Sequence, residues 1–316
     1  MIMRSPRVSV VIPTHDRPQM VREAIESVRA QSYDRIEIVV VDDGSPTPIA
    51  PLLEGTDESL AVIRHEDNRG ANAARNTGIR ESTGEVLAFL DDDDRWESHK
   101  VERQVAAFES DRPVPGVVIV GQRFVNDAGE TTSIKRPDLN GIVTEELFGG
   151  GTAGGFSAIA VRRAVLDESG LPDASFPSLQ DREWLIRLSK HCRFHSIEEP
   201  LVIRRMGSHA QIADRYVEKR DQTYHRMLEV HGEEARSRGL HGAFRASLAR
   251  SVAASAVEAG AYDDARRFAL RALRDNPTDP YPVFVLLATI GGSTTYRPLK
   301  RLKRQVGHHR QGTGNR

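Results

Sequence analysis

Hydrophobic and polar positions in the first 100 residues follow two alternating patterns. Four runs rich in β-branched and apolar residues are typical of buried strands: VSVVIP (8–13), IEIVVVDDGS (36–45), SLAVIRH (59–65) and EVLAFLDDDD (85–94). Between these runs, residues 18–32 carry apolar side chains at helical spacing, and residues 70–83 are rich in helix formers. The alternation predicts a mostly parallel sheet with helices on both faces.

The pattern becomes irregular after residue 116. It predicts a strand in GVVIVGQRFV, a glycine-rich loop and an apolar run in FGGGTAGGFSAIAVRR (148–163), and a helix in SLQDREWLIRLSKH (178–191). From about residue 215 nearly everything has a helical pattern, and residues 260–281 have the small-residue spacing of a tetratricopeptide-type hairpin. The sequence therefore predicts an α/β domain over 1–214, a helical extension over 215–296 and a basic tail over 297–316.

The composition favours a globular protein outside the membrane. The chain has 316 residues, 39% of them hydrophobic and 28% charged, and a net charge of -1 that argues against general nucleic-acid binding. Its single cysteine, Cys192, excludes an internal disulfide and fits a reducing compartment. The start, MIMRSPR, lacks the apolar core of a secretory signal, and no apolar run approaches the roughly 20 residues of a membrane span. We expect a cytoplasmic protein.

Acidic residues follow two of the predicted strands. Asp42 and Asp43 end the second strand, and Asp91 to Asp94 end the fourth. Ligands of open parallel sheets bind beyond the carboxyl ends of the strands. If the fourth strand continues through the acidic run, side-chain alternation places Asp91 and Asp93 on one face. Such a group suits a hard divalent cation that also binds substrate phosphates.

A simpler interpretation is a solvated turn, in which Asp94 caps a helix that begins near Trp96. The strand context and the second acidic strand end favour the interpretation with a metal ion and a diphosphate.

Five motifs, in order, resemble glycosyltransferase family 2 over residues 7 to 210: VSVVIPTHDR, VVVDDGS, NRGANAARNTGI, GEVLAFLDDDD and QDREWLIRL. The resemblance implies a GT-A fold, which is Rossmann-like. It also implies a nucleotide-sugar donor, a divalent cation such as Mg²⁺ or Mn²⁺, and a reaction that inverts the anomeric centre.

The resemblance also implies the donor-binding residues. The loop after the first strand matches the family's nucleotide contact, and Asp43 with Asp42 matches the carboxylate that accepts a hydrogen bond from the base, which favours a UDP-type donor. The segment with Arg75 and Asn76 matches residues near the nucleotide and diphosphate, although Asn76 also fits an ordinary polar helix surface. The loop residues concerned are Pro13, Thr14 and His15.

The acidic run matches the family's metal motif at three of its four positions. Asp91, Asp93 and Asp94 occupy the conserved acidic places of that motif, and the resemblance makes Asp93 and Asp94 ribose and metal contacts. Asp92 occupies the variable place and is expected to be solvated. His209 falls where some relatives have a ligand for the metal or the diphosphate; a purely structural histidine is the alternative.

The resemblance implies that Asp181 is the catalytic base. The alternative is that its negative charge only stabilises the N-terminus of the helix. Glu183 is the nearest competitor, but it lies about 200° around the helix from Asp181. Trp96 and Trp184 are expected in the core or in a platform. The glycines of GGGTAGG predict close backbone approach to a ligand, and the missing lysine excludes a phosphate-binding P-loop.

These residues predict an inverting glycosyltransferase that moves a sugar from a nucleotide diphosphate to a hydroxyl of a glycan or lipid-linked glycan, in glycan, glycolipid or polysaccharide assembly. One alternative is a sugar nucleotidyltransferase, for which PTHDRPQ lacks the usual glycine-rich basic loop. Another is a scaffold with a decayed transferase domain, against which the intact acids argue.

The last twenty residues, 297–316, carry seven Lys or Arg and no acid. Because basic clusters beside an apolar helix are attracted to anionic lipid, this tail predicts peripheral contact with the cytoplasmic face of a membrane. A solvated tail without a partner is the alternative.

Overall fold

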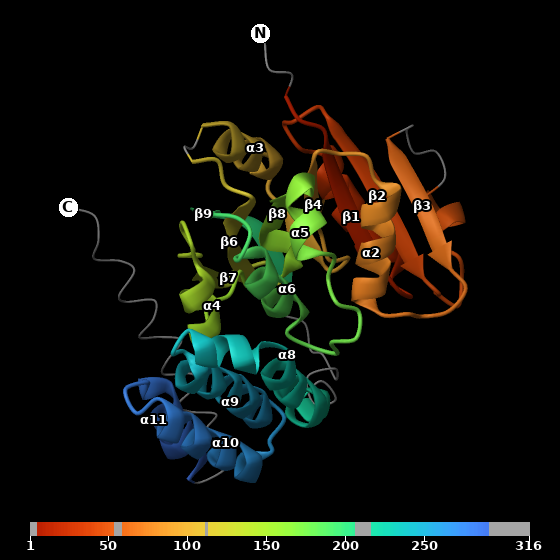
Figure 1. Cartoon of the computed structure of the whole chain (residues 1–316). Helices are drawn as coiled ribbons and strands as arrows, with labels where there is room; N and C mark the ends of the chain where they lie inside the picture. The colour runs from red at the N-terminus through yellow and green to blue at the C-terminus, as the bar shows by residue number, and fades with distance from the viewer. Residues whose placement is uncertain (1–4, 54–58, 111–112, 206–215, 291–316) are drawn as a thin grey trace, which may run out of the picture. The chain divides into compact units, whose positions relative to one another are not determined.

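The computed structural model describes residues 5–53, 59–110, 113–205 and 216–290 (Figure 1). The chain divides into two compact units. The first comprises residues 1–147 and 151–208, and the second comprises residues 148–150 and 209–316.

One mixed sheet forms the centre of the first unit. In the described residues its order is β3-β2-β1-β4-β8-β6-β9-β5, and β7 pairs with β6 outside this path. The strands are β1 (Val8–Thr14), β2 (Ile36–Asp43), β3 (Leu60–His65), β4 (Val86–Phe89), β5 (Asp94–Trp96), β6 (Val117–Val125), β7 (Thr131–Lys135), β8 (Ile159–Arg162) and β9 (Phe194–Arg205).

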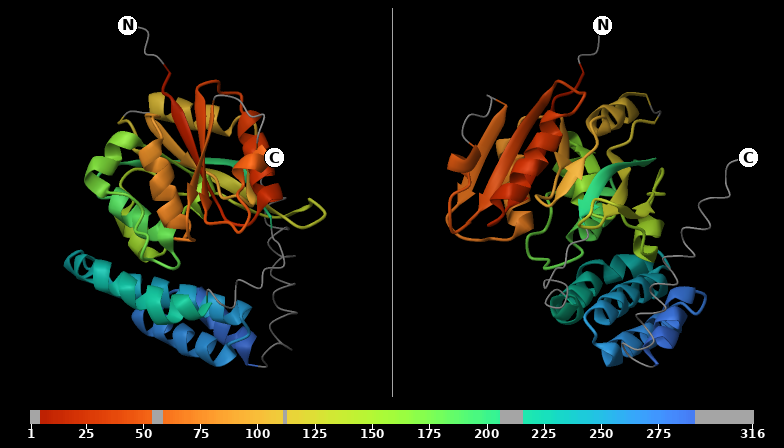
Figure 2. Two further views of the ribbon diagram at one scale, coloured as in Figure 1. Left: turned by 90° about the vertical axis from the view of Figure 1, so that its right-hand side faces the viewer. Right: turned by 180° about the vertical axis from the view of Figure 1, so that it is seen from behind.

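The first four strands are parallel, as the sequence predicts. Val8 pairs with both Ile36 and Val86, so β1 lies between β2 and β4. Every residue of β1 is buried because helices cover both faces. Helix α2 (Ala71–Glu81) lies on the face seen in Figure 1, and α1 (Pro18–Arg29) lies on the face seen from behind in Figure 2. This arrangement confirms the predicted α/β fold.

The other half of the sheet is mixed, and here the sequence pattern is irregular. Strand β8 runs antiparallel to β4 and β6, β9 runs parallel to β6, and β5 and β7 are antiparallel additions. The helical segments of this unit are η1 (Ala50–Leu53), α3 (Lys100–Ser110), α4 (Thr144–Gly149), η2 (Phe156–Ala158), η3 (Arg163–Val165), α5 (Leu166–Ser169) and α6 (Gln180–Leu188). Helix α4 ends within the segment assigned to the second unit.

The fourth strand is shorter than the sequence predicts. It ends at Phe89, and the backbone then turns, with the Asp94 amide donating to the Asp91 carbonyl at 3.0 Å. The condition under which strand alternation would place Asp91 and Asp93 on one face is therefore not met. The alternative role of Asp94 as a helix cap is wrong, because Asp94 begins β5 and the next helix starts at Lys100.

Aromatic core residues pack between the elements that flank this turn. Trp184 of α6 is fully buried, its ring centroid lies 5.5 Å from that of Phe89 and 5.8 Å from that of Phe156, and its indole N–H donates to the Gly170 carbonyl at 3.0 Å. Trp96 is also buried, and its indole N–H donates to the Ser157 carbonyl at 3.0 Å. Both tryptophans therefore belong to the core, as expected, and fix the elements on which the acidic turn rests.

The second unit is helical in its described residues. A π-helical stretch, η4 (Lys219–Thr223), leads into α8 (Tyr224–Ser237), and three helices follow: α9 (His241–Glu258), α10 (Tyr262–Asp275) and α11 (Pro280–Thr289). Helices α9 and α10 are joined by a three-residue connection and pack on each other, and α10 packs on α11. The tetratricopeptide assignment stays a prediction. In the described parts of both units, none of the helices combines the length and apolar character needed to cross a bilayer.

Candidate active site

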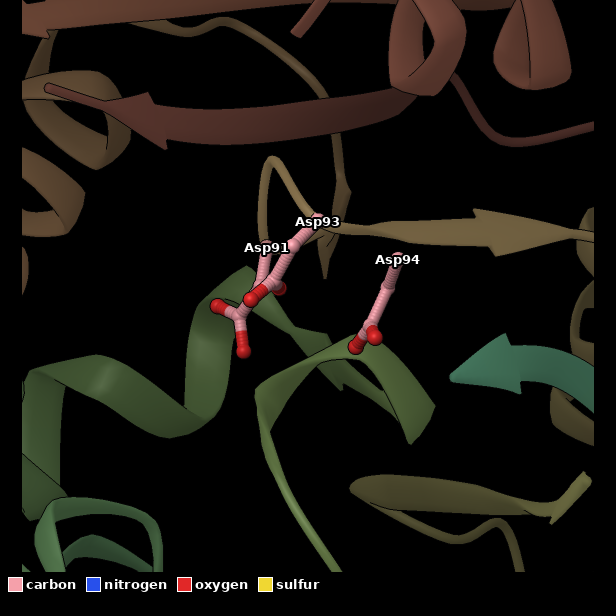
Figure 3. A group of neighbouring side chains, drawn as sticks. All are labelled: Asp91, Asp93 and Asp94. Carbon is pink, nitrogen blue, oxygen red and sulfur yellow. The ribbon is translucent and has the colours of Figure 1, made fainter. Parts of the chain in front are cut away.

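The turn after β4 gathers the carboxylates of the acidic run. One oxygen from each of Asp91, Asp93 and Asp94 lies within 4.8 Å of the others. Figure 3 shows the three side chains, with the Asp91 and Asp93 carboxylates next to each other. Asp94 is buried, whereas Asp91 and Asp93 reach solvent in part. The turn thus presents a compact acidic group with one open side.

Three arginines neutralise the run, each from a different element. Arg17, before α1, lies 3.0 Å from Asp92 and 3.4 Å from Asp93. Arg75 of α2 pairs with Asp91, and Arg204 of β9 lies 3.3 Å from Asp94. Every aspartate of the turn therefore has a cationic partner within the protein. Along the chain, Arg17 is 75 residues from Asp92, Arg75 is 16 residues from Asp91, and Arg204 is 110 residues from Asp94. The fold therefore brings these charges together.

Asp92 is not solvated, so this expectation is wrong. The residue is buried, and its carboxylate accepts hydrogen bonds from the Thr14 hydroxyl at 2.8 Å and from Arg17. Burial raises the pKa of Asp92, although the bonds from Thr14 and Arg17 oppose the rise. Thr14 and Asp92 thus tie the end of β1 to the acidic turn.

Asp94 is the most strongly perturbed acid of the turn. Burial raises the pKa of Asp94 to about 7; the Arg204 charge opposes this rise, while the charges of Asp91 and Asp93 add to it. The Ser157 hydroxyl donates to the Asp94 carboxylate at 2.6 Å. A cation bound at the turn would favour the ionised form of this carboxylate.

The donor set fits a divalent cation. Three carboxylates from one turn offer hard oxygen ligands, and the open side leaves room for water and phosphate oxygens, as Mg²⁺ and Mn²⁺ sites require. Asp91, Asp93 and Asp94 would hold the ion. The further candidate ligand His209 lies outside the described residues.

The acids at the end of β2 have different roles in the fold. The Asp42 carboxylate is buried and is occupied by the backbone amides of Ser45 and Ile49 and by Arg64. Asp43 accepts from the backbone amides of Arg69 and Gly70 and bonds to the His65 ring, so it anchors the N-terminus of α2. Among the described residues, one oxygen of Asp43 accepts a hydrogen bond only from the Gly70 amide, which leaves it capacity for a further donor.

The other predicted donor-binding residues surround the same edge of the sheet. Pro13 and Thr14 are buried at the end of β1, and His15 is exposed with its Nδ1 2.8 Å from the Asp43 carbonyl. This contact joins the loop after β1 to the loop after β2. A ligand at this edge would meet both loops.

Arg75 and Asn76 are both buried in α2. The Arg75 guanidinium stacks 3.9 Å from the centre of the Phe156 ring and reaches Asp91. The Asn76 amide donates to the Pro172 carbonyl at 2.8 Å, so the alternative of an ordinary polar helix surface is wrong. Arg75 lies at the acidic turn, whereas Asn76 fixes the segment between α5 and α6.

Asp181 and Glu183 differ in the hydrogen bonds and ion pairs that their carboxylates make. Glu183 is buried, and Arg187 binds both of its oxygens at 2.8 and 2.9 Å. The Asp181 side chain is partly exposed at the start of α6, and within the part of the chain that the structure describes it has neither a hydrogen bond nor an ion pair. Asp181 is thus the free carboxylate of the two, and its charge acts on Arg204 together with those of Asp91, Asp93 and Asp94.

The glycine-rich loop packs against the site's supporting residues. A Cβ on Gly154 would lie 2.3 Å from Nε2 of Gln122, and the Gly154 carbonyl accepts from Arg204 at 2.6 Å. Gly154 thus permits the close approach of Gln122, while the predicted approach of this loop to a ligand stays a prediction. Sequence reasoning missed Arg17, Ser157 and Arg204; only Arg17 had a signal, its place at the end of the VSVVIPTHDR motif.

The raised pKa of Asp94 generates a prediction about stability. Between about pH 4, where the carboxyl of an unfolded chain ionises, and about pH 7, the folded protein holds a proton that the unfolded chain releases, so the free energy of unfolding falls as pH rises through this window. In EDTA, Asp94→Asn should gain stability over the wild type by up to about 4 kcal/mol between pH 4 and pH 8. Urea unfolding at each pH measures this difference.

The exposed Asp167→Asn variant serves as the control, because its curve should follow that of the wild type. A wild-type curve that rises relative to Asp94→Asn over this window would contradict the burial of an acid with a raised pKa.

Comparison with known proteins places this site in a family. The family model described as "Glycosyl transferase family 2" matches residues 9–170. An uncharacterized glycosyltransferase of Haemophilus influenzae is 28% identical over 61% of this chain and 66% of its own length. The chain spans as little as 16% of the length of another relative, from Rickettsia bellii.

Two solved structures share the fold. S. aureus TarS 1–349, in complex with UDP-GlcNAc, is similar with a TM-score of 0.55 and 17% identity over 87% of this chain and 75% of that one. The Pyrobaculum calidifontis mannosyltransferase PcManGT, in complex with GDP-Man and Mn²⁺, is similar with a TM-score of 0.56 and 18% identity over 90% and 84%. These likenesses confirm the GT-A fold, and the family model covers β1 to α5 with the whole acidic turn: the chain belongs to glycosyl transferase family 2.

Proposed function

We propose that this chain is an inverting glycosyltransferase that moves a sugar from a nucleotide-diphosphate sugar to an acceptor hydroxyl. The observation that carries the proposal is the acidic turn at the carboxyl edge of the parallel strands, where one oxygen from each of Asp91, Asp93 and Asp94 lies within 4.8 Å of the others. The setting is glycan, glycolipid or polysaccharide assembly, and the acceptor is a glycan or a lipid-linked glycan.

The donor is a nucleotide sugar, and a UDP-type donor is favoured. TarS has been solved with UDP-GlcNAc and PcManGT with GDP-Man and Mn²⁺, so this fold accepts both kinds of donor in other proteins. In this chain, the spare acceptor capacity of Asp43 suits an N–H donor of a base such as uracil. A bound Mg²⁺ or Mn²⁺ would neutralise the diphosphate next to Asp91, Asp93 and Asp94.

The proposed reaction is a single displacement. The acceptor oxygen forms a bond to the anomeric carbon while the bond from that carbon to the diphosphate breaks, and the electron pair leaves with the diphosphate. Asp181 takes the proton from the acceptor hydroxyl, a role that typically contributes 10²- to 10⁴-fold to the rate. One displacement inverts the anomeric centre.

The alternatives fit less well. Membership of the family argues against a nucleotidyltransferase. The scaffold alternative requires a decayed site, but all the acids are present, and the four acids of the turn are each paired within the protein.

A thermal-shift screen of nucleotide sugars with Mn²⁺ or Mg²⁺ tests the proposal, because a ligand that binds only the folded state raises its stability. We expect one nucleotide sugar to raise the melting temperature with the cation and not without it. No shift with any nucleotide sugar would contradict the proposed function.

Donor binding should depend on the metal. Asp93→Ala removes a partly exposed ligand of the proposed cation, so it should weaken donor binding and abolish transfer. Donor affinity is measured by calorimetry with and without EDTA, and Asp94→Ala should behave in the same way. Asp127→Ala, in the β6–β7 turn, is a control that should bind the donor normally. Unchanged donor affinity in EDTA would contradict a metal-bridged diphosphate.

Substitutions at Asp181 and Glu183 distinguish the proposed base from its neighbour. Asp181→Asn should keep the fold and nearly native donor binding but lose about 10²-fold or more in turnover, because the residue acts chiefly in the transition state. Glu183→Gln is the matched control: it weakens the pair with Arg187 and so lowers thermal stability, while the folded protein keeps most of its turnover. Near-native transfer by Asp181→Asn, or a product with retained anomeric configuration, would overturn this assignment.

We further propose that the C-terminal end contacts an anionic membrane surface. Three apolar residues in and directly after α11 are exposed at helical spacing: Val283, Leu287 and Ile290. Ile290, the residue after the helix, is 73% exposed. The segment that follows contributes five basic residues: Arg297, Lys300, Arg301, Lys303 and Arg304. Basic residues beside an apolar helical face are each attracted to anionic lipid by about 1 kcal/mol.

Replacement of these five residues by glutamine should reduce co-sedimentation of the full chain with phosphatidylglycerol vesicles, and Leu287→Ser should reduce it further. Pure phosphatidylcholine vesicles control for apolar binding. Equal co-sedimentation of the wild type and the five-residue variant would contradict membrane contact through the tail.

A further inference from the structure

Two cations approach one aromatic ring in the mixed half of the sheet. The Lys135 ammonium, from β7, lies 5.2 Å from the centre of the Phe124 ring, and the Arg204 guanidinium carbon, from β9, lies 5.7 Å from it. Phe124 belongs to β6, the strand between them, and pairs with Ser133 on one side and Arg204 on the other. The strand order therefore brings two like charges to the same ring.

Both cations retain donors that the protein does not use. Arg204 uses Nε for Asp94 and Nη1 for the Gly154 carbonyl, and its Nη2 has no acceptor among the described residues. Lys135 is exposed, and within the described ranges its ammonium has neither a hydrogen bond nor an ion pair. An ammonium carries three N–H donors, so this pair offers several donors to one incoming group.

The two cations differ in their contacts with the acidic turn. Desolvation by the surrounding protein lowers the pKa of Lys135, the Arg204 charge lowers it further, and Asp181 opposes both. Desolvation also lowers the pKa of Arg204, but Asp94, Asp91, Asp93 and Asp181 outweigh it and raise the value. Arg204 pairs with the metal-binding carboxylate Asp94, whereas Lys135, on β7, contacts none of the three metal-binding acids within the described residues.

We propose that Lys135 and Nη2 of Arg204 form an anion-binding subsite for a phosphate or carboxylate group of the acceptor. Two like charges near one another repel, and an anion bound between them removes the repulsion while it satisfies their free donors. In this proposal, an acceptor held by such a group would present a hydroxyl to Asp181. The assignment to an acceptor rests on the proposed function, because it takes Asp181 as the base.

The donor diphosphate is the other possible source of an anion at this subsite. The diphosphate belongs beside Asp91, Asp93 and Asp94, of which Asp94 pairs with Arg204 and none contacts Lys135 among the described residues. The position of Lys135 thus favours the acceptor.

Calorimetric titration with methyl phosphate tests the subsite. The full-length protein is first saturated with the nucleotide diphosphate and cation identified in the thermal-shift screen, so that the donor's phosphate site is filled. Wild type should bind methyl phosphate, and Lys135→Gln should bind it on the order of tenfold more weakly, because it loses a charge-assisted contact. Arg136→Gln removes an exposed cation from the next residue and should bind like the wild type.

Three outcomes would overturn the subsite or its assignment. Wild type that shows no binding below about 10 mM excludes a specific site, and equal affinity of wild type and Lys135→Gln excludes Lys135. Binding that disappears when the nucleotide is present assigns the cations to the donor diphosphate instead. If no nucleotide binds in the screen, the proposed function fails, whereas methyl phosphate binding that depends on Lys135 in the nucleotide-free chain still supports the anion subsite.

Discussion

Mutual repulsion among four consecutive carboxylates is the constraint on which the rest of this site depends. Asp91 to Asp94 occupy one turn, and two of them are buried, which would be costly without compensation. Arg17, Arg75 and Arg204 supply that compensation from three separate elements. The arginines come from the segment before α1, from helix α2 and from strand β9, so full compensation of the turn requires all three elements in place.

The arginines of the site are themselves held in place by neighbouring residues. Arg75 stacks on Phe156, which packs with Phe89 and Trp184, so the cation rests on the aromatic core of the unit. Arg204 is held by the Gly154 carbonyl and by Asp94, at a point where a larger residue in place of Gly154 would meet Gln122. A cation held by its own contacts costs little further entropy when it pairs with an acid.

The two halves of the sheet contribute different parts of the site. The parallel half supplies the loops after β1 and β2 and the acidic turn, where a nucleotide and its diphosphate are proposed to bind. The mixed half, through β7 and β9, supplies Lys135 and Arg204, and α6 supplies Asp181. Arg204 pairs with Asp94, and the charge of Asp181 also acts on it. Arg204 therefore links the acidic turn with Asp181 electrostatically. The proposed donor and acceptor sites thus use different strands but share one cation.

The sequence by itself determined the parallel half of the fold and the position of the acidic turn. Buried parallel strands leave long β-branched runs, and acids at their ends are visible because they interrupt those runs. The resemblance to a family added Asp181, which no local pattern distinguishes from Glu183. Only the tertiary structure decided that Glu183 is occupied by Arg187, that Asp92 is buried against Thr14, and that Arg204 and Lys135 approach Phe124. These contacts join residues from different strands and helices, and strand order and register, which local sequence does not encode, determine which of them meet.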